Sequence, residues 1–367
     1  MITTAAPLSL TDYETLARAK MEPSAWDYYA GAAGDERTLA DNAAAYGRIK
    51  LVPRVLVDVS TIDPAVTALG TPLSMPIMLA PTAFNRLAHA EGELAASRAA
   101  AGAGTLMIAS TIATSTLEDI AAAADGPRWF QLYIYKDRQV TIDLVARAEA
   151  AGYRAIVLTV DTPMLGYRER DARNGFRLPE GLGIANFAGL ERSRNWDAGS
   201  SFFAYVHALF DASLTWDTLA WLRSVTKLPI LLKGILSSDD ARLAVSHGAS
   251  GIVVSNHGGR QLDDSIATID ALPAIADAVG GEIELFLDGG IRRGADVLKA
   301  IALGARAVCI GRPYLWGLAA AGEEGVRGVL DILRREFVLA MALAGCPSVA
   351  RIDRSLIAGA HTGRPTK

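Results

Sequence analysis

The sequence predicts an α/β protein built as a (β/α)8 TIM barrel, with an N-terminal helical extension and a long connection after the fourth strand. Eight short apolar runs recur from about residue 75, and helical patterns lie between most of them. The runs are near-continuous rather than alternating, which is typical of parallel strands covered on both faces. A chain of 367 residues suits one large barrel, so we expect a single domain over residues 1–367.

The eight candidate strands are bounded by turn residues or by the start of a helical pattern. They lie at 77–80 (IMLA), 105–110 (TLMIAS), 129–135 (WFQLYIY), 155–161 (AIVLTVD), 230–234 (ILLKG), 251–256 (GIVVSN), 285–290 (LFLDGG) and 307–311 (AVCIG). The helical stretches between them are 91–104, 116–124, 137–152, 237–250, 267–281 and 294–305, several with a capping residue first and Gly at the end. An open doubly wound sheet is the alternative, but the G-x-G-x-x-G expected after its first strand is missing.

The barrel is expected to span residues 75–345. Two parts of the chain do not follow its strand–helix repeat, one before the barrel and one within it. Residues 1–74 contain three helical segments and short extended pieces, which we expect to close the bottom of the barrel and reach round its side. The connection 165–213 is rich in Gly, Asn, Ser and Arg. Because connections of this length are usually functional or mobile, we interpret it as an active-site lid, with a decorated loop as the alternative.

Composition excludes several classes of protein. A net charge of −4 implies no basic surface for nucleic acid. Two uncharged windows, 64–85 and 99–117, are too rich in Pro or in Gly, Ser and Thr to span a membrane, and the first residues do not resemble a signal peptide. Cys309 and Cys346 form no disulfide framework, and no Cys/His cluster suggests a metal. We therefore expect a soluble, cytoplasmic protein.

Polar groups stand at almost every strand end, which is where barrels of this kind carry their chemistry. Any one of these groups alone is more often structural, but eight aligned ends indicate a site. The last two strands end in DGGIRRG and IGRP, where glycines allow close approach to an anion and arginines match phosphate oxygens. This predicts a phosphate site, with a tight turn as the alternative for DGG; its candidate residues are Asp288, Gly290, Arg292, Gly311 and Arg312.

The remaining strand ends suggest the rest of the ligand. Ser110, Gln131 and Thr159 offer hydrogen bonds to a flat polar ring, and Lys233 offers a fixed positive charge. A ring that becomes anionic on reduction is stabilised by such a charge. The combination favours flavin mononucleotide (FMN) over a sugar phosphate.

The stretch SNHGGRQLD (255–263) contains the candidate catalytic base. An imidazole with an ordinary pKa near ~6.5 can accept a proton at neutral pH, so His257 is the candidate base. Asp161, at another strand end, is the candidate that orients it. A simple strand cap is the alternative for His257. The other four histidines, His89, His207, His247 and His361, are interpreted as structural.

A carboxylate clamp is predicted beside the base. Two guanidinium groups can hold a carboxylate, and phenols can add hydrogen bonds. The candidates are Arg168, Arg260, Tyr28 and Tyr133.

These residues resemble those of the FMN-dependent α-hydroxy-acid oxidase and dehydrogenase family, which includes glycolate and lactate oxidases. SNHGGRQLD matches the active-site signature, and YYAGA, MPIMLAPTA, FQLY, LTVDTP, LLKG, FLDGGIRRG and IGRP match other blocks, from about Tyr13 to Ile357. The resemblance implies that His257 and Asp161 are catalytic and that the clamp residues above bind substrate. It also implies flavin contacts for Pro81, Thr82, Ala83, Ser110, Gln131, Thr159, Lys233 and Ser255, and ribityl and phosphate contacts for the DGGIRRG and IGRP residues.

One position departs from the glycolate oxidase pattern. Where S-x-W-A-T-S is expected, the chain has Ile112 in place of the tryptophan. Losing an indole removes bulk and an N–H donor, so the substrate pocket is expected to be roomier or more apolar. L-lactate and longer aliphatic or aromatic 2-hydroxy acids then become candidates, with Met164 and Leu165 as further apolar walls.

The expected reaction is oxidation of an (S)-2-hydroxy acid to the 2-oxo acid, with O2 reoxidising FMN and giving hydrogen peroxide. A dehydrogenase that uses a quinone or another acceptor, a monooxygenase-like outcome, a flavin-free phosphate-binding lyase or isomerase, and a non-catalytic binding barrel are the alternatives. The resemblance also implies a homo-oligomer, a tetramer or octamer.

Overall fold

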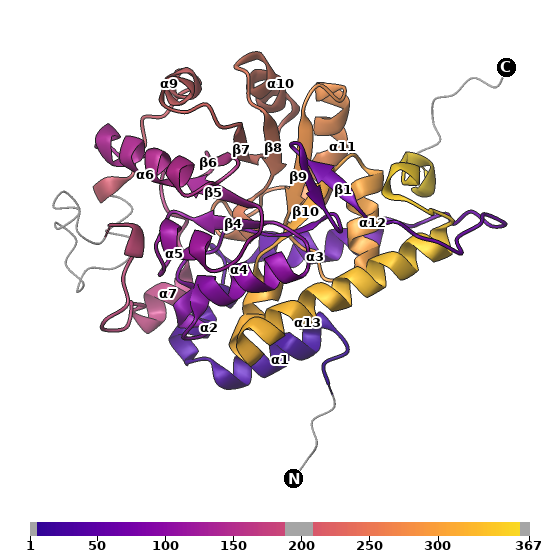
Figure 1. Cartoon of the computed structure of the whole chain (residues 1–367), viewed down its shortest axis with the longest axis horizontal. Helices are drawn as coiled ribbons and strands as arrows, with labels where there is room; N and C mark the ends of the chain where they lie inside the picture. Colours follow the sequence, from indigo (N-terminus) through magenta and orange to yellow (C-terminus); the bar gives the residue numbers. More distant parts are fainter. Residues whose placement is uncertain (1–5, 188–207, 360–367) are drawn as a thin grey trace, which may run out of the picture.

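Eight parallel strands close into a barrel in this computed structural model, which describes residues 6–187 and 208–359. Around the barrel the strands follow the order β10-β3-β4-β5-β6-β7-β8-β9, and helices surround them (Figure 1). The predicted (β/α)8 barrel is therefore confirmed. That the whole chain is one domain stays a prediction.

All eight predicted strands are present, and most end a few residues earlier than expected. They are β3 (Ile77–Leu79), β4 (Met107–Ser110), β5 (Arg128–Leu132), β6 (Ile156–Thr159), β7 (Ile230–Ile235), β8 (Gly251–Val254), β9 (Glu284–Asp288) and β10 (Ala307–Ile310). The predicted strand residues that lie beyond the observed strand ends include polar residues such as Asp161 and Asn256. Asp161 hydrogen-bonds to His257, and Asn256 hydrogen-bonds to Asn42.

Helices cover the outside of the barrel. Those predicted are α4 (Gly92–Gly102), α5 (Leu117–Ala122), α6 (Arg138–Ala150), α10 (Ser238–Ser246), α11 (Thr268–Val279) and α12 (Gly294–Ala302). Side chains of Thr116, Asp137 and Ser237 cap α5, α6 and α10, as Ser, Thr and Asp commonly do. Among the described residues, three α-helices were not predicted: α7 (Glu169–Asn174), α9 (Asp217–Val225) and α13 (Arg312–Ala344), whose backbone breaks at Ala321 and Gly322.

The N-terminal segment divides between the two ends of the barrel. Its hairpin, β1 (Val66–Ala68) and β2 (Thr71–Leu73), packs on the interior core, and the N–H of Leu69 donates to Glu284 at the start of β9. Of its helices, α1 (Leu10–Lys20) packs along α13, while α2 (Pro23–Ala30) contacts α7 and α3 (Arg37–Arg48) contacts α11 and the turn at His257. Our expectation that this segment closes the bottom therefore holds only for the hairpin, because α2 and α3 lie against loops that follow the strands.

Barrel closure creates two apolar layers, as expected for strands buried on both faces. Met78, Ile108, Trp129, Leu231 and Phe286 belong to the interior cluster. Their neighbours along the strands belong to the larger cluster between the sheet and the helices. The register of the strands also sets polar ends beside each other: Ser110 pairs with Gln131, Thr159 with Lys233, and Cys309 with Asp288.

The first turn of α3 is capped from the far end of the signature stretch. Glu36 stands at the N-cap without a capping side chain. The carboxylate of Asp263 instead accepts from the N–H groups of Arg37 (3.3 Å) and Thr38 (2.9 Å). This contact satisfies two of the N–H groups that a helix leaves unpaired, and it joins α3 to the loop after β8.

We predict that Asp263→Ala lowers the free energy of unfolding by about 1 kcal/mol, because the first turn of α3 loses its acceptor. Urea denaturation followed by circular dichroism measures the change. Asp125→Ala, at an exposed carboxylate for which no hydrogen bond is seen, is the matched control. Equal stability of the two variants would contradict a capping role for Asp263.

Candidate active site

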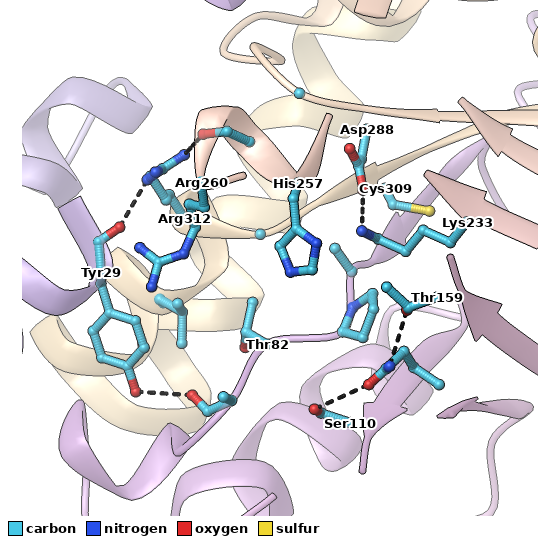
Figure 2. A pocket seen from close by; sticks show the side chains of 18 of the residues that line it. Tyr29, Thr82, Ser110, Thr159, Lys233, His257, Arg260, Asp288, Cys309 and Arg312 are labelled. Carbon is cyan, nitrogen blue, oxygen red and sulfur yellow. Dashed lines mark hydrogen bonds and ion pairs between the residues drawn. The ribbon is translucent and has the colours of Figure 1, made fainter. Parts of the chain in front are cut away.

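A single pocket collects the residues from the strand ends. It holds about 1120 Å³ of unfilled space, its open mouth included. Of the twenty predicted site residues, these line it: Tyr28, Pro81, Thr82, Ala83, Ser110, Ile112, Gln131, Tyr133, Thr159, Arg168, Lys233, His257, Arg260, Asp288, Gly290, Arg292, Gly311 and Arg312. Figure 2 shows His257 between the guanidinium groups of Arg260 and Arg312 on one side and Lys233 with Asp288 on the other.

Two predicted residues stand behind the pocket wall. Asp161 contacts His257 from the side away from the pocket lining, and its Oδ2 atom has no hydrogen-bond partner. Ser255 is fully buried, and its hydroxyl accepts the N–H of His257 at 3.1 Å. Ser255 is not among the lining residues and supports the loop, and its flavin contact stays a prediction.

His257 is held in one orientation. Its backbone has φ 58°, an unusual conformation for a residue with a side chain. Its Nδ1 atom lies 2.9 Å from Oδ1 of Asp161. Because an ionised carboxylate only accepts, Nδ1 carries the proton and the lone pair of Nε2 stays available. Burial lowers the pKa of His257 below its ordinary value, and the opposing charge of Asp161 only partly restores it. The imidazole is therefore neutral at neutral pH.

Asp161 stays ionised beside this imidazole. Burial alone would raise the pKa of Asp161. At the low pH where Asp161 titrates, however, His257 is protonated, and its charge together with that of Lys233 outweighs burial and holds the pKa of Asp161 at about 2. The hydroxyl of Thr162 adds a hydrogen bond at 3.0 Å. The pair can therefore accept a proton on Nε2 while the carboxylate stabilises the resulting imidazolium.

Lys233 gives the pocket a permanent positive charge. Its Nζ atom lies 3.6 Å from Oδ2 of Asp288, and both side chains are almost completely buried. Burial favours the neutral amine, but the carboxylates of Asp288 and Asp161 outweigh it and raise the pKa of Lys233. Oδ1 of Asp288 has no partner, so this buried acceptor is available to a ligand hydroxyl.

A chain of hydrogen bonds joins three neighbouring strand ends. The Ser110 hydroxyl donates to Oε1 of Gln131 (3.2 Å), and Nε2 of Gln131 donates to the Thr159 hydroxyl (2.9 Å). Figure 2 shows Ser110 and Thr159 on the other side of the pocket from His257. These hydrogen bonds fix the orientation of the Gln131 amide. A site that recognises a polar ring requires such a fixed orientation.

Two arginines lie close to two phenols near the pocket mouth. The Arg260 guanidinium donates to the carbonyl oxygens of Tyr28 and Gly31 and lies 4.9 Å from the centre of the Tyr28 ring. Arg168 is 8% exposed, and its Nε atom has no partner. Burial, followed by repulsion from Arg260, lowers the pKa of Arg168 to about 10. Burial raises the pKa values of Tyr28 and Tyr133, so both phenols remain protonated donors.

The predicted phosphate residues gather at the ends of β9 and β10. Arg312 donates through three nitrogens to the carbonyl oxygens of Tyr29, Gly258 and Gly31, which accounts for three of its five N–H groups. Arg292 bonds to the carbonyl of Ile291. Gly290 has φ 79°, and a Cβ atom there would lie 1.9 Å from the carbonyl oxygen of Asn42, so only glycine fits between this loop and α3.

The charge of the pocket fits a phosphate-bearing flavin. Five cationic side chains line it (Arg168, Lys233, Arg260, Arg292 and Arg312), whereas Asp288 is its only lining carboxylate among the described residues. A Cβ atom at Gly311 would meet nothing closer than 3.6 Å, so this glycine leaves space beside Thr82. Unpaired buried groups at Arg168 and Asp288 complete a set of donors and acceptors that phosphate, ribityl hydroxyls and a carboxylate can satisfy.

Sequence reasoning missed several lining residues. Phe210 lies on the pocket and stacks on Tyr133, with 4.6 Å between ring centres; an apolar residue in a polar connection was the only signal. Leu165 also lines the pocket as expected, whereas Met164 is 55% exposed and not part of the lining, which corrects its expected role. The rest of the expected lid, residues 188–207, lies outside the described residues.

The other two histidines among the described residues take local partners. Nδ1 of His89 lies 3.3 Å from the N–H of Glu91, just before α4, and Nδ1 of His247 lies 2.8 Å from the carbonyl of Leu243. His207 and His361 fall outside the described residues. Cys309 and Cys346 are buried and unpaired. Within residues 6–187 and 208–359, no cluster of His, Cys, Asp and Glu could hold a metal ion, and no helix has the length and hydropathy needed to cross a membrane.

Known proteins resemble this chain over almost its whole length. The family model described as FMN-dependent dehydrogenase matches residues 17–359. An L-lactate oxidase from Nostoc sp. is 52% identical over 97% of this chain and all of that protein. The 2-hydroxyacid oxidase 1 of Homo sapiens is 52% identical, covering 95% of this chain and 96% of that protein. A solved mandelate oxidase with (S)-4-hydroxymandelic acid is 46% identical, with a TM-score of 0.90 and coverage of 95% and 98%.

We predict that His257 titrates below its ordinary pKa of ~6.5 and that Asp161→Asn lowers this pKa further, because the charge of Asp161 is what raises it. NMR of protein labelled at histidine follows the titration, and the resonance missing in a His257→Gln variant gives the assignment. A His257 pKa that rises in Asp161→Asn would contradict the pairing.

Proposed function

The chain belongs to the FMN-dependent dehydrogenase family, and on that premise we propose that it oxidises an (S)-2-hydroxy acid to the 2-oxo acid, with O2 as the final oxidant and hydrogen peroxide as the second product. It is an oxidoreductase of the 2-hydroxy-acid oxidase type. One observation carries the proposal: a buried, neutral imidazole and two guanidinium groups face the same pocket. Together they match the hydroxyl and the carboxylate of one small acid.

FMN is the cofactor, and the pocket residues divide its recognition among them. When bound, FMN would supply the two-electron oxidation of the substrate C–H bond, with O2 as the final electron acceptor. Ser110, Gln131 and Thr159 are suited to the polar edge of its ring, and Lys233 to the negative charge of its reduced form. Asp288 suits the ribityl hydroxyls, and the remaining ring and phosphate contacts are proposed for Pro81, Thr82, Ala83, Gly290, Arg292, Gly311 and Arg312.

The substrate carboxylate is placed between Arg168 and Arg260. Both guanidinium groups lie on the pocket, and burial, followed by repulsion from Arg260, lowers the pKa of Arg168. A bound carboxylate would offset both effects. The protonated phenols of Tyr28 and Tyr133 donate further hydrogen bonds. Holding the acid at one end orients its hydroxyl for a single base.

His257 is that base. Its Nε2 atom accepts the hydroxyl proton while Nδ1 keeps its hydrogen bond to Asp161. The C–O bond gains double-bond character as the C–H bond breaks, and Asp161 stabilises the imidazolium that forms. The base must start neutral, so the reaction is fully available above the pKa of His257 and is lost as the pH falls through it.

Three apolar side chains define the room for the rest of the substrate. Ile112, Leu165 and Phe210 line the pocket, and Ile112 is 3% exposed. We assign to this region the side chain on the α-carbon of the acid. Apolar walls favour the methyl of L-lactate or a longer aliphatic or aromatic group over the bare hydrogen of glycolate.

The cytoplasm is the proposed compartment, and a homo-oligomer (a tetramer or octamer) is the proposed form. Two free cysteines support a reducing compartment. Val55, Leu56 and Leu343 are 81%, 104% and 69% exposed, and exposed apolar groups of this size support an interface between copies.

Anaerobic mixing of the yellow holoprotein with a panel of 2-hydroxy acids tests the proposal. We expect (S)-2-hydroxy acids to bleach the bound flavin and air to restore its colour with one peroxide per turnover. Colourless protein that takes up no FMN would contradict the cofactor, and flavin that no 2-hydroxy acid bleaches would contradict the reaction. Bleaching without stoichiometric peroxide in air would favour another electron acceptor.

In the same assay, His257→Ala should keep FMN bound and slow bleaching by about 10²- to 10⁴-fold, the usual contribution of a general base.

We predict that Ile112→Trp shifts the preference toward glycolate, changing the ratio of kcat/KM for glycolate and a longer acid by about tenfold or more. The indole takes up space that the side chain of a longer substrate would fill. Steady-state peroxide assays with glycolate, L-lactate and mandelate measure the ratio. An unchanged substrate profile would show that position 112 does not set the size of the pocket.

A further inference from the structure

The loops after β6 and β8 touch each other although β7 separates their strands in the barrel. The loop after β6 carries Asp161 and Arg168, and the loop after β8 carries His257 and Arg260. The imidazole and its carboxylate therefore come from different loops, and so do the two guanidinium groups. Their mutual geometry depends on how the two loops are joined.

The side-chain amide of Gln261 links the two loops. Its Nε2 group donates to the carbonyl oxygens of Asp161 (2.7 Å) and Met164 (2.9 Å), and its Oε1 atom accepts the N–H of Gly166 (3.1 Å). Both N–H groups of the amide and one lone pair of its oxygen are thus used on one short segment. An amide supplies two donors and an acceptor on a single planar group, which a carboxylate or a hydroxyl cannot do.

The backbones of the two loops also lie against each other. A Cβ atom at Gly166 would stand 2.4 Å from the carbonyl oxygen of Arg260 and 2.7 Å from Cα of Gln261. The chain at Gly166 therefore packs directly on the chain at residues 260 and 261, and Gln261 bonds across this contact. Gln261 itself does not line the pocket, so it acts through the groups that it holds.

We propose that Gln261 is a positioning residue for the oxidation, because its three hydrogen bonds set Asp161 and Arg168 in place relative to His257 and Arg260. The inference rests on the proposed function and deepens it. One bond ends on the carbonyl of the residue that pairs with His257, and another ends two residues before Arg168. Loss of the amide frees both partners at once, so chemistry and carboxylate binding weaken together.

The test compares Gln261→Met with the wild-type holoprotein. Methionine has a similar length and makes none of the three bonds. We expect the rate of anaerobic flavin reduction to fall by about 10- to 100-fold, as small misplacements of reacting groups do, and the substrate KM to rise. The charged groups around His257 are Asp161, Lys233, Arg168, Arg260, Arg312 and Asp288. Asp161 raises the pKa of His257, whereas Lys233 and Arg168 lower it. A loosened Asp161 should therefore shift the acid limb of the kcat/KM profile to lower pH.

The control is Gln139→Met, which removes a glutamine whose amide bonds to Asp143 on the outer helix α6. It should leave the rate, KM and pH profile unchanged. Gln261→Glu keeps the acceptor for Gly166 but sets a carboxylate against two carbonyl oxygens, and it should lower the reduction rate and raise KM as Gln261→Met does. Its added negative charge raises the pKa of His257, so the acid limb is compared only between the wild type and Gln261→Met. Gln261→Glu serves as the test if the methionine variant does not fold.

Three readouts separate the possible outcomes. A lower melting temperature with unchanged reduction rate, KM and acid limb would overturn the proposal and leave Gln261 with a structural role only. NMR titration of His257 in the FMN-free wild type and Gln261→Met provides a readout independent of turnover, and an unchanged pKa would also contradict the proposal. Failure of the wild-type flavin to be bleached by any 2-hydroxy acid would instead contradict the proposed function.

Discussion

The hydrogen bond between His257 and Asp161 is the interaction on which the rest of the site depends. It decides that Nδ1 carries the proton, and it leaves Nε2 as the only basic nitrogen of the ring. Burial makes the neutral imidazole the stable form, whereas the same bond stabilises the cation once a proton arrives. A base needs both properties, and neither residue supplies them alone.

Burial of positive charge is the second constraint. Arg168, Lys233, Arg260, Arg292 and Arg312 line one pocket, and much of their charge is balanced by backbone carbonyl oxygens rather than by carboxylates. Burial, followed by repulsion between the guanidinium groups, lowers the pKa values of Arg168 and Arg312, which means that holding these charges together is costly. An anionic cofactor and an anionic substrate both relieve this cost, so the strain of the fold favours binding of the two ligands.

The sequence predicted the barrel and the pocket-lining residues well. It predicted less well the contacts that hold those residues in place. Parallel strands buried on both faces leave continuous apolar runs, and their ends point to one edge, so most of the polar lining residues could be found at strand ends. Ile112 does not follow from that pattern and was identified through the family resemblance. Contacts between distant segments leave no such pattern. The place of α2 and α3 was missed because it depends on single bonds, such as those between Asn42 and Asn256, and Phe210 was missed because its connection showed no periodicity. The predicted flavin contact of Ser255 stays a prediction, but its hydrogen bond to the N–H of His257 was not foreseen.

These supports explain why so much of SNHGGRQLD serves both chemistry and folding. His257 and Arg260 face the pocket, whereas Asn256 bonds to Asn42 and Asp263 caps α3, so the same nine residues dock the N-terminal helices. The N-terminal helices in turn contribute to the site. Tyr28 on α2 lines the pocket, and the carbonyl of Gly31 accepts hydrogen bonds from both Arg260 and Arg312. The loop after β8 is thus folded by partners that are themselves part of the site. A change in either the helices or the loop must therefore alter the orientation of the base and the clamp together.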